Sequence, residues 1–344
     1  MKYLIYILSA FLFVIVSVTT MNAMGIRNIN KLSGYIESWS DYSIRRIDLA
    51  TGKSEEIFRK NQNINIGNYL IYFDISPDGK ERVLATTGSV STGCKDDSDN
   101  PTKLLIYTDD KKLTTIMNKA FVGYPSFSPD GKFIAYLFSQ YEKEKKNWVG
   151  DQYLYLISSD GSSDKQVSKI SCDIHKPSWF PDGKKLAVGS KNLDICIIDI
   201  RTGTEKRIID FGMAPSVSHD GKKIVYMSKE VDASVKTSMV GYQKITMKEY
   251  KDTYMNKKDK QKEMELATLF QKFSIFIYDV ASGKSKKLTD ELFVSQSDPL
   301  IWSPDDKYIL YTDRKWEGLN IYALNIETAE KQKVTYGIAM GWVY

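Results

Sequence analysis

Histidine is scarce in this chain, which has His175 and His219 and no other among its 344 residues. A metal site built on several imidazole ligands is therefore excluded, because one or two histidines cannot supply the ligand set. The sequence also lacks a paired-cysteine zinc motif, a phosphate-binding glycine loop, a nucleophile elbow and a Ser/His/Asp order. These absences favour a protein without catalytic activity, although a nucleophile assembled from distant segments would leave no such pattern.

Cysteine is nearly as rare, with three residues in the chain. Cys196 lies in the apolar run Ile195–Ile198 and is expected inside a strand. Cys94 and Cys172 lie in predicted loops on one face of the molecule. Two interpretations stay open, a Cys94–Cys172 disulfide or three free thiols, because spacing alone does not establish connectivity.

Long hydrophobic runs are confined to the N-terminus, where Lys2 precedes the apolar stretch Leu4–Thr20. Small residues at Ala23–Gly25 suit an export peptidase, and no cysteine follows closely enough for a bacterial lipoprotein anchor. Residues 1–25 are therefore expected to be either a cleaved signal peptide or a retained N-terminal anchor of minimal length. Both alternatives predict export to the periplasm or outside the cell, and the second adds a membrane tether.

A strong excess of one charge is also missing, since the formal net charge is +5. A nucleic-acid groove needs clustered basic residues beside a stacking platform. The sequence predicts no nucleic-acid partner and no cofactor.

What the chain does have is a repeated turn, best seen at Phe127–Tyr136. There Ser-Pro-Asp-Gly-Lys separates two apolar stretches, with proline fixing one φ angle and glycine accepting a positive one. The middle aspartates of the five copies are Asp78, Asp130, Asp182, Asp220 and Asp305. Turn geometry explains all five aspartates, and His219 takes the proline position of one copy. The aspartates and His219 are therefore not candidates for a metal site. The shortest spacing between copies suits the four-stranded module of a propeller blade.

A second repeat consists of strand pairs that alternate apolar and polar residues, as half-buried antiparallel strands do. Its six copies are Ser43–Phe58, Leu104–Met117, Tyr153–Ser168, Leu193–Ile209, Ser274–Thr289 and Leu319–Thr335. The halves of a sixth inner hairpin are Gly337–Tyr344 at the C-terminus and Leu32–Ser40 at the N-terminus. We therefore predict an all-β, six-bladed β-propeller in which the C-terminal strand closes the ring against N-terminal strands.

The Ser-Pro-Asp-Gly-Lys turns, together with outer hairpins such as Ile277–Lys284, resemble the TolB-like β-propeller family. The resemblance extends from about residue 30 to the end of the chain and implies the scaffold alone. The expected arrangement is a propeller over 26–344 without the α/β domain that precedes the propeller in TolB or the hydrolase domain of prolyl oligopeptidase-like enzymes. The Trp-Asp signature of WD-type propellers is absent.

The predicted insertions Gly88–Pro101, Gln140–Asp151 and Lys229–Lys272 all join the second and third strands of a blade. In a propeller these loops share one face with the blade-to-blade linkers, while the Ser-Pro-Asp-Gly turns form the opposite face. We call these the loop-rich face and the turn face. Because binding residues concentrate on variable loops carried by a rigid scaffold, the loop-rich face is the predicted binding face.

His175 leads into an inner strand from that face, and equivalent positions in other blades bring further residues to the channel mouth. The candidate ligand-binding residues are Tyr124, His175, Lys176, Met213 and Asp298. As a set they suit a small ligand or a peptide. A satisfied structural histidine is the alternative for His175.

Two further segments each have two interpretations, one in which the segment binds something and one in which it is only a solvated part of the structure. Asp96, Asp97 and Asp99 are a calcium candidate, but a complete site needs six to eight oxygen ligands, and a solvated acidic loop explains them as well. Residues 244–272 have helical periodicity and many lysines. A helix there would either contact a membrane surface or partner, or pack over the propeller with its lysines in water.

The expected function is that of an exported, non-catalytic binding or scaffold protein of the cell envelope. It would bind a protein, peptide or small ligand through the loop-rich face. The alternative is a propeller-type hydrolase, lyase or lactonase acting on an extracytoplasmic substrate.

Overall fold

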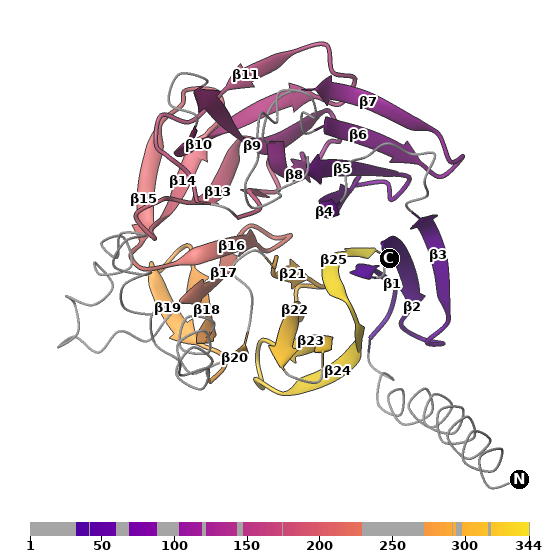
Figure 1. Ribbon diagram of the computed structural model, residues 1–344. Coiled ribbons are helices and arrows are strands. Elements are labelled where there is room, and N and C mark those ends of the chain that lie inside the picture. Colours follow the sequence, from indigo (N-terminus) through magenta and orange to yellow (C-terminus); the bar gives the residue numbers. More distant parts are fainter. Residues whose placement is uncertain are drawn as a thin grey trace, which may run out of the picture.

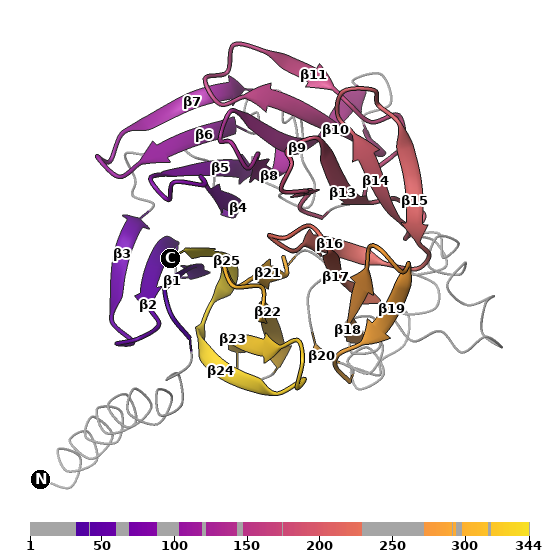
Figure 2. The same ribbon diagram turned by 180° about the vertical axis from the view of Figure 1, so that it is seen from behind.

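The computed structural model describes the chain over residues 32–40, 42–59, 69–87, 103–118, 122–142, 147–173, 175–228, 272–290, 292–293, 298–315 and 318–343. These residues form six antiparallel sheets arranged around a common centre, which is the predicted six-bladed propeller (Figure 1; Figure 2 from behind). Among the described residues, no helical segment has the length and apolar character that a membrane span requires.

Each blade runs from an inner strand at the channel to an outer strand at the rim. Blade 1 is β25 (Ile338–Val343), β1 (Tyr35–Ser40), β2 (Ser43–Asp48) and β3 (Ser54–Arg59). Blade 2 is β4 (Tyr69–Ile75), β5 (Glu81–Thr87), β6 (Lys103–Thr108) and β7 (Leu113–Asn118). Blade 3 is β8 (Val122–Phe127), β9 (Phe133–Glu142), β10 (Asn147–Ser158) and β11 (Asp164–Gln166).

The second half of the ring repeats this order. Blade 4 is β12 (Ser178–Trp179), β13 (Lys185–Gly189), β14 (Ile195–Asp199) and β15 (Glu205–Ile209). Blade 5 is β16 (Met213–Val217), β17 (Lys223–Ser228), β18 (Lys272–Asp279) and β19 (Lys284–Lys287). A short strand that the sequence did not predict, β20 (Leu292–Phe293), also pairs with β18. Blade 6 is β21 (Ile301–Trp302), β22 (Tyr308–Lys315), β23 (Gly318–Asn325) and β24 (Lys331–Tyr336).

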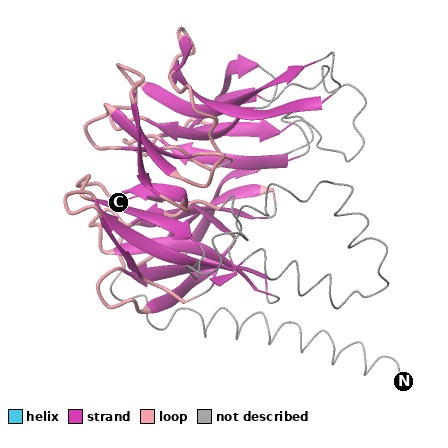
Figure 3. Cartoon of the chain, turned by 90° about the vertical axis from the view of Figure 1, so that its left-hand side faces the viewer, coloured by secondary structure: helices cyan, strands magenta, loops and turns pink. Residues whose placement is uncertain are grey.

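The repeated turns behave as the sequence predicts. In blade 3, Ser128 Oγ donates to Asp130 Oδ1 at 2.7 Å, the Lys132 amide donates to the same oxygen at 3.2 Å, and Gly131 has φ +71°. The Lys132 carbonyl then accepts the Ser159 amide of the outer hairpin at 2.9 Å, and equivalent bonds tie the two turns of other blades. These turns and the C-terminal end of β25 lie along the left-hand face in the side view of Figure 3.

The core lies between the blades. The described residues contain six buried hydrophobic clusters, one between each pair of neighbouring blades around the ring. Inner strands are further joined by hydrogen bonds: Trp179 Nε1 donates to the Ser126 carbonyl of the preceding blade at 3.1 Å, and Trp302 Nε1 to that of Ser216 at 2.9 Å. Because each blade buries its faces only against its neighbours, the fold needs the complete ring.

The C-terminal strand closes that ring as predicted. β25 pairs antiparallel with β1, with Tyr35 opposite Val343 and Ile36 opposite Trp342. The strand order β25-β1-β2-β3 combines one C-terminal strand with three N-terminal strands in one blade. Closure removes the two open sheet edges that a linear array of blades would expose.

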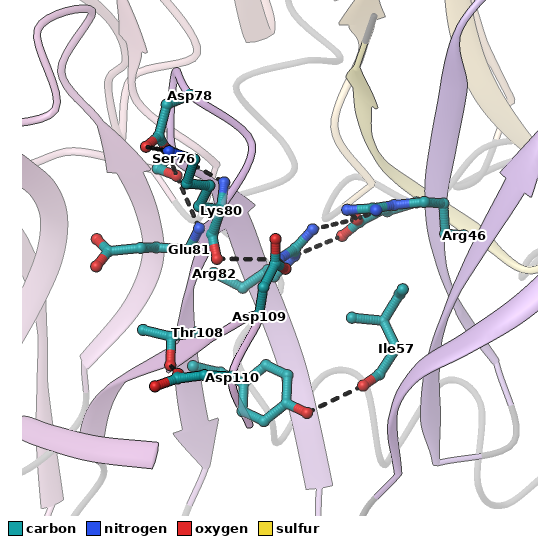
Figure 4. A network of polar contacts seen from close by, with 12 residues as sticks. Arg46, Ile57, Ser76, Asp78, Lys80, Glu81, Arg82, Thr108, Asp109 and Asp110 are labelled. Carbon is teal, nitrogen blue, oxygen red and sulfur yellow. Dashed lines mark hydrogen bonds and ion pairs between the residues drawn. The ribbon is translucent and has the colours of Figure 1, made fainter. Parts of the chain in front are cut away.

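A buried polar network joins blade 1 to blade 2 beside this closure (Figure 4). The carboxylate of Glu37, on β1, accepts Arg82 Nη2 of β5 at 2.7 Å and Arg46 Nη2 of β2 at 2.8 Å. The side chains of Glu37 and Arg82 are fully buried. Arg82 also pairs with Asp109, in the turn between β6 and β7. Pairing and hydrogen bonding are what make buried charges tolerable, so the network fixes the two blades in one relative position.

The expectation of a loop over Gln140–Asp151 is only partly correct. β9 and β10 extend through Glu142 and from Asn147, and their backbones pair at Asn147 opposite Glu142 and Trp148 opposite Tyr141. Aromatic residues favour strands, so the hairpin lengthens here instead of opening into a loop. The other two insertions, the acidic residues 96, 97 and 99, the N-terminal segment 1–25 and the predicted helix over 244–272 lie outside the described residues, apart from Lys272 at the start of β18.

Candidate functional site

The inner strands enclose a central cavity of about 710 Å³. Its walls change character from one face of the ring to the other. At the turn face the lining includes Pro77, Pro129, Pro181 and Pro304; midway lie Asp74, Ser126, Ser178 and Ser216; toward the loop-rich face lie His175, Lys176 and Asp298. Pro215 lines the cavity from within β16, where a proline is tolerated because one edge of each inner strand faces the channel and needs no hydrogen-bond partner.

An ion pair spans two blades on one side of this cavity. Lys176 Nζ, from the segment entering blade 4, lies 2.6 Å from Asp74 Oδ1 on β4 of blade 2. The second oxygen of Asp74 accepts the Phe127 amide of blade 3 at 2.8 Å. Asp74 thus connects three consecutive blades, and both side chains of the ion pair are mostly withdrawn from solvent. A pair of this kind orders the channel wall because each charge needs the other in a low-dielectric setting.

Two tyrosines lie beside this ion pair in blades 2 and 3. The rings of Tyr72 and Tyr124 have centroids 4.0 Å apart, and Tyr124 OH donates to Tyr72 OH at 3.1 Å. Tyr124 adopts φ +57° at an irregularity in the pairing of β8, a conformation that is unusual for a bulky residue. Burial first, and then Tyr72 and the negative charges of Asp173 and Asp298, raise the pKa of Tyr124. Its hydroxyl therefore stays protonated and lies within electrostatic range of both carboxylates.

His175 lies at the loop-rich end of the cavity, with its side chain 1% exposed. Its Nδ1 is 3.0 Å from Asp173 Oδ2, an ion-pair distance at an angle that makes no hydrogen bond. Neither ring nitrogen has a hydrogen-bond partner among the described residues. A buried polar group without a partner is rare and points to a ligand or a bound water.

The loop-rich face also displays aromatic side chains. Tyr42, in the turn between β1 and β2, is 56% exposed, and Phe211, in the linker to β16, is 36% exposed. Both have positive φ, +60° and +59°, where a bulky residue is strained. Tyr336, at the end of β24, is exposed on the same face, whereas exposed Tyr35 begins β1 at the turn face. Burial explains none of these positions.

The structure brings together part of the predicted site. His175, Lys176 and Asp298 line the cavity, and Asp298 is almost completely buried. Tyr124 and Met213 are buried by packing instead, Tyr124 against Tyr72 and Met213 in the hydrophobic cluster between blades 5 and 6. That these residues bind a ligand stays a prediction.

Sequence reasoning missed Asp74, Tyr72 and Asp173. The sequence did carry a signal for the first two. Residues two apart on a strand share a face, as Tyr72 and Asp74 do. These two residues also precede the turn aspartate Asp78 by the same numbers of residues as Tyr124 and Ser126 precede Asp130. Asp173 lies in a linker without periodicity, so only the folded chain places it against His175.

The remaining candidates concern metals and thiols. In the part of the chain that the structure describes, no three His, Cys, Asp or Glu side chains are grouped to hold a metal ion. Cys172 and Cys196 are buried free thiols, so the interpretation with free thiols holds for these two. Burial raises the pKa of Cys172 to about 12 and that of Cys196 to about 11, which keeps both protonated.

Comparison with known proteins gives a family and a fold. The profile described as the TolB beta propeller domain matches residues 103–337. The fold resembles TolB from Acinetobacter baumannii, with a TM-score of 0.61 at 15% identity over 90% of this chain and 66% of that one. It also resembles an oligogalacturonate lyase from Vibrio parahaemolyticus, with a TM-score of 0.52 at 14% identity over 86% and 75% of the two chains.

Among curated proteins, the chain is 27% identical over 223 residues to the "uncharacterized peptidase YuxL" of Bacillus subtilis (strain 168). That match covers 61% of this chain and 31% of YuxL. The chain thus spans about a third of the length of the curated relatives it matches first.

Proposed function

The chain belongs to the TolB β-propeller family, and on that premise we propose that it is an exported, non-catalytic binding protein of the cell envelope. It would take a protein, peptide or small ligand at the loop-rich face of its propeller. Export rests on the character of residues 1–25, which suit a signal peptide or an N-terminal anchor.

The observation that carries the proposal is the pair of strained, exposed aromatics Tyr42 and Phe211. A left-handed backbone costs folding energy at a bulky residue, and an exposed ring recovers little of it by burial. Strain of this kind concentrates at functional positions, and large aromatics are the side chains that dominate binding energy at protein interfaces. Both residues lie on the face predicted to bind, which supports a partner at that face.

The test compares three forms of the chain in a quantitative pull-down from envelope extract of the source organism. The Tyr42→Ala/Phe211→Ala double variant should lose the captured partner. Tyr35→Ala, which removes an exposed aromatic from the turn face, should retain it. Capture of the same proteins by all three forms would overturn the proposal, and circular dichroism controls for folding.

We also propose that the lysine-rich segment 244–272 contributes to this binding, either at a protein or at an anionic membrane surface. Ser228, the last residue of β17, pairs with Ser274 near the start of β18, so a short Gly/Asn turn can replace residues 229–271 and leave β18 complete. The shortened chain should fold and lose association that is sensitive to salt, measured by co-sedimentation at low and high ionic strength. Association that is unchanged by the replacement would place the contact elsewhere.

A second candidate is a propeller-type hydrolase, lyase or lactonase. It is favoured by the Asp173–His175 pair beside the cavity, because an aspartate next to a histidine is a common arrangement for a general base. The names of the relatives, a peptidase and a lyase, suggest peptides and oligogalacturonate as first substrates to assay. Turnover that disappears in His175→Gln would favour this candidate over simple binding.

A further inference from the structure

The chain enters the propeller at the turn face, between blades 6 and 1. Leu32 is 5% exposed and packs in the hydrophobic cluster between these two blades. The Ser33 carbonyl accepts Trp342 Nε1 at 3.0 Å, and the Gly34 carbonyl accepts the amide of Leu49, in the turn between β2 and β3, at 3.0 Å. Three consecutive residues are thus held against the ring, which fixes the point where the preceding part of the chain joins it.

The linker before this point, residues 26–31, is short. It separates Leu32 from residues 1–25, which suit a signal peptide or an N-terminal anchor. Six residues span at most about 20 Å, and less in any conformation that is not fully extended. In the anchored form of the chain, Leu32 therefore lies within about 20 Å of the bilayer.

The loop-rich face lies farther from Leu32 than the linker can reach. In blade 6, β22 and β23 have eight residues each and run from one face of the ring to the other. At about 3.3 Å per residue, these strands make the blade about 26 Å tall. A propeller with its loop-rich face against the bilayer would hold Leu32 at about that height, which exceeds the reach of the linker. With the turn face toward the bilayer, Leu32 is within reach.

The charges of the repeated turns do not supply a competing cause for the orientation. The lysines of four turns are exposed, but each lies between 3.5 and 3.9 Å from the aspartate of its own turn; they are Lys80, Lys132, Lys222 and Lys307. Paired charges at a surface attract an anionic bilayer weakly, and salt screens what remains. The covalent linker is therefore the feature that orients the ring.

We propose that residues 1–25 stay attached as a membrane anchor and that the anchored propeller stands with its turn face toward the bilayer. The loop-rich face then points into the aqueous compartment, where a protein or peptide partner has access to Tyr42 and Phe211. Of the two contacts proposed for the lysine-rich segment 244–272, this orientation favours the protein, because the bilayer lies on the other side. The inference rests on the proposed function, takes its anchored form and adds the direction from which the partner approaches.

The experiment is fluorescence quenching of the full chain in phosphatidylcholine vesicles that contain a lipid with a nitroxide head group. The fluorophore is attached to a cysteine introduced into a Cys94→Ser background, because Cys172 and Cys196 are buried, protonated thiols that react poorly. Thr328→Cys places the label on the turn face, and Tyr336→Cys places it on the loop-rich face. The two positions flank opposite ends of β24, so they compare the two faces of one blade.

The label at residue 328 should be quenched more strongly than the label at residue 336, by about twofold or more, because β24 separates the two positions by about 20 Å. The ratio should be the same at low and high salt. Equal quenching, or stronger quenching at residue 336, overturns the orientation. A labelled chain without residues 1–25 should not be quenched at either position, and quenching of residue 328 that persists in that chain overturns the role of the anchor.

A longer linker tests the cause of the orientation. About 20 Gly/Ser residues inserted between Gly25 and Ile26 give a coil with an average reach of about 28 Å, which allows either face to meet the bilayer. The difference in quenching between residues 328 and 336 should then shrink. A difference that stays the same would mean that the turn face itself binds lipid, and orientation by the linker would be wrong.

Retention of the anchor is tested by intact-mass spectrometry of the chain from the membrane fraction of the source organism. Residues 1–25 should be present, and a chain that lacks them overturns the proposal. These tests fail independently of the partner test. The Tyr42→Ala/Phe211→Ala variant should lose its partner and keep the same quenching pattern, and a reversed orientation in vesicles leaves the result of the pull-down unchanged.

Discussion

At the turn face, two residues that differ from the repeated sequence lie in contact with each other. His219 takes the place of proline in blade 5, and Asp306 takes the place of glycine in blade 6, at φ +55°. Asp306 Oδ1 accepts the His219 amide at 2.9 Å and lies 2.8 Å from its Nδ1, while Oδ2 accepts the Asp220 amide at 3.0 Å. Elsewhere the turns meet through packing, as where Pro181 lies against Gly221. A polar link between blades 5 and 6 thus replaces an apolar one.

This link predicts an ordering of two substitutions. Asp306→Ala should lower the free energy of unfolding by about 1–2 kcal/mol, because the hydrogen bonds are lost and the left-handed backbone remains. Asp306→Gly loses the same bonds but relieves the backbone, so it should cost less. Urea denaturation of both variants measures the difference. An alanine variant as stable as the glycine variant would show that the backbone is not strained here.

The turn aspartates predict how stability responds to acid. The Ser128 hydroxyl first, and then the Lys132 amide, lower the pKa of Asp130, and Ser76 does the same for Asp78. A group whose pKa is lower in the folded chain contributes stability above its unfolded value, near 3.8, and that contribution is lost as pH falls through the folded value. The urea midpoint should therefore fall with acidification below about pH 4.

The serines provide the test of this cause. In the Ser76→Ala/Ser128→Ala variant the two aspartates lose their hydroxyl donors, so the drop in urea midpoint between about pH 6 and pH 3 should be smaller than in the unmodified chain. The variant loses stability at both pH values because Ser128 Oγ also accepts the Phe133 amide, and only the pH dependence is informative. An unchanged drop would assign the acid sensitivity to other carboxylates.

Strand edges and blade boundaries explain why the cavity was only partly predictable. The repeat locates the start and end of each inner strand, so His175, Lys176 and Asp298 could be placed near the channel from their register. Pairing irregularities between Gly123 and Ser126 and between Met213 and Ser216 then change which side chains face the channel. Each irregularity contains a proline, Pro125 or Pro215, which marks a break in pairing but does not say which side chains then turn away from the channel, and Tyr124 and Met213 are packed in the walls.

The contact of β1 with β5 through Glu37 and Arg82 could not be predicted from the sequence. The two residues are far apart in the chain, and each charged residue, taken alone, is expected at the surface. Glu37 and Arg82 are both fully buried. Removing one partner of a buried pair leaves the other charge uncompensated, so Glu37→Gln should lower the free energy of unfolding by about 3–5 kcal/mol. Urea denaturation measures it.

An exposed pair on the outer strand of blade 1 serves as the control for this prediction. Glu56 pairs with Arg59 on β3, where Arg59 is half exposed, and Glu56→Gln should cost less than about 1 kcal/mol. Equal losses for Glu37→Gln and Glu56→Gln would mean that water reaches the buried network and that it does not fix blade 1 against blade 2.

On the scale of the whole molecule, two independent repeats made the ring predictable. The turn repeat supplies five inner hairpins and the strand-pair repeat supplies six outer ones, and this mismatch locates the closure from the sequence alone. Neither repeat concerns the ligand, since every blade carries the same turn chemistry whatever the channel binds. Function on such a scaffold depends on residues that break the repeat, and those are the residues for which one sequence offers no periodic signal.

Closure of the ring by β25 leads to a testable prediction about stability. β25 supplies the inner strand of blade 1, buries Ala339 and Met340, and passes so close to blade 2 that a Cβ on Gly341 would lie 2.4 Å from Ile75 Cδ1. Deleting residues 337–344 exposes the edge of β1 and the apolar faces on both sides. The melting temperature of the truncated chain should fall by about 10 °C or more, with a broader transition.

A peptide with the deleted sequence distinguishes loss of the strand from general damage. Added in trans, residues 337–344 can pair with the open edge of β1 and should raise the melting temperature as their concentration increases, because a ligand that binds only the folded state stabilises it. A scrambled peptide of the same composition should have no effect. A truncated chain that melts like the full one would contradict closure by β25. If truncation lowers the melting temperature and the peptide does not restore it, β25 contributes during folding and cannot be added back to the finished ring.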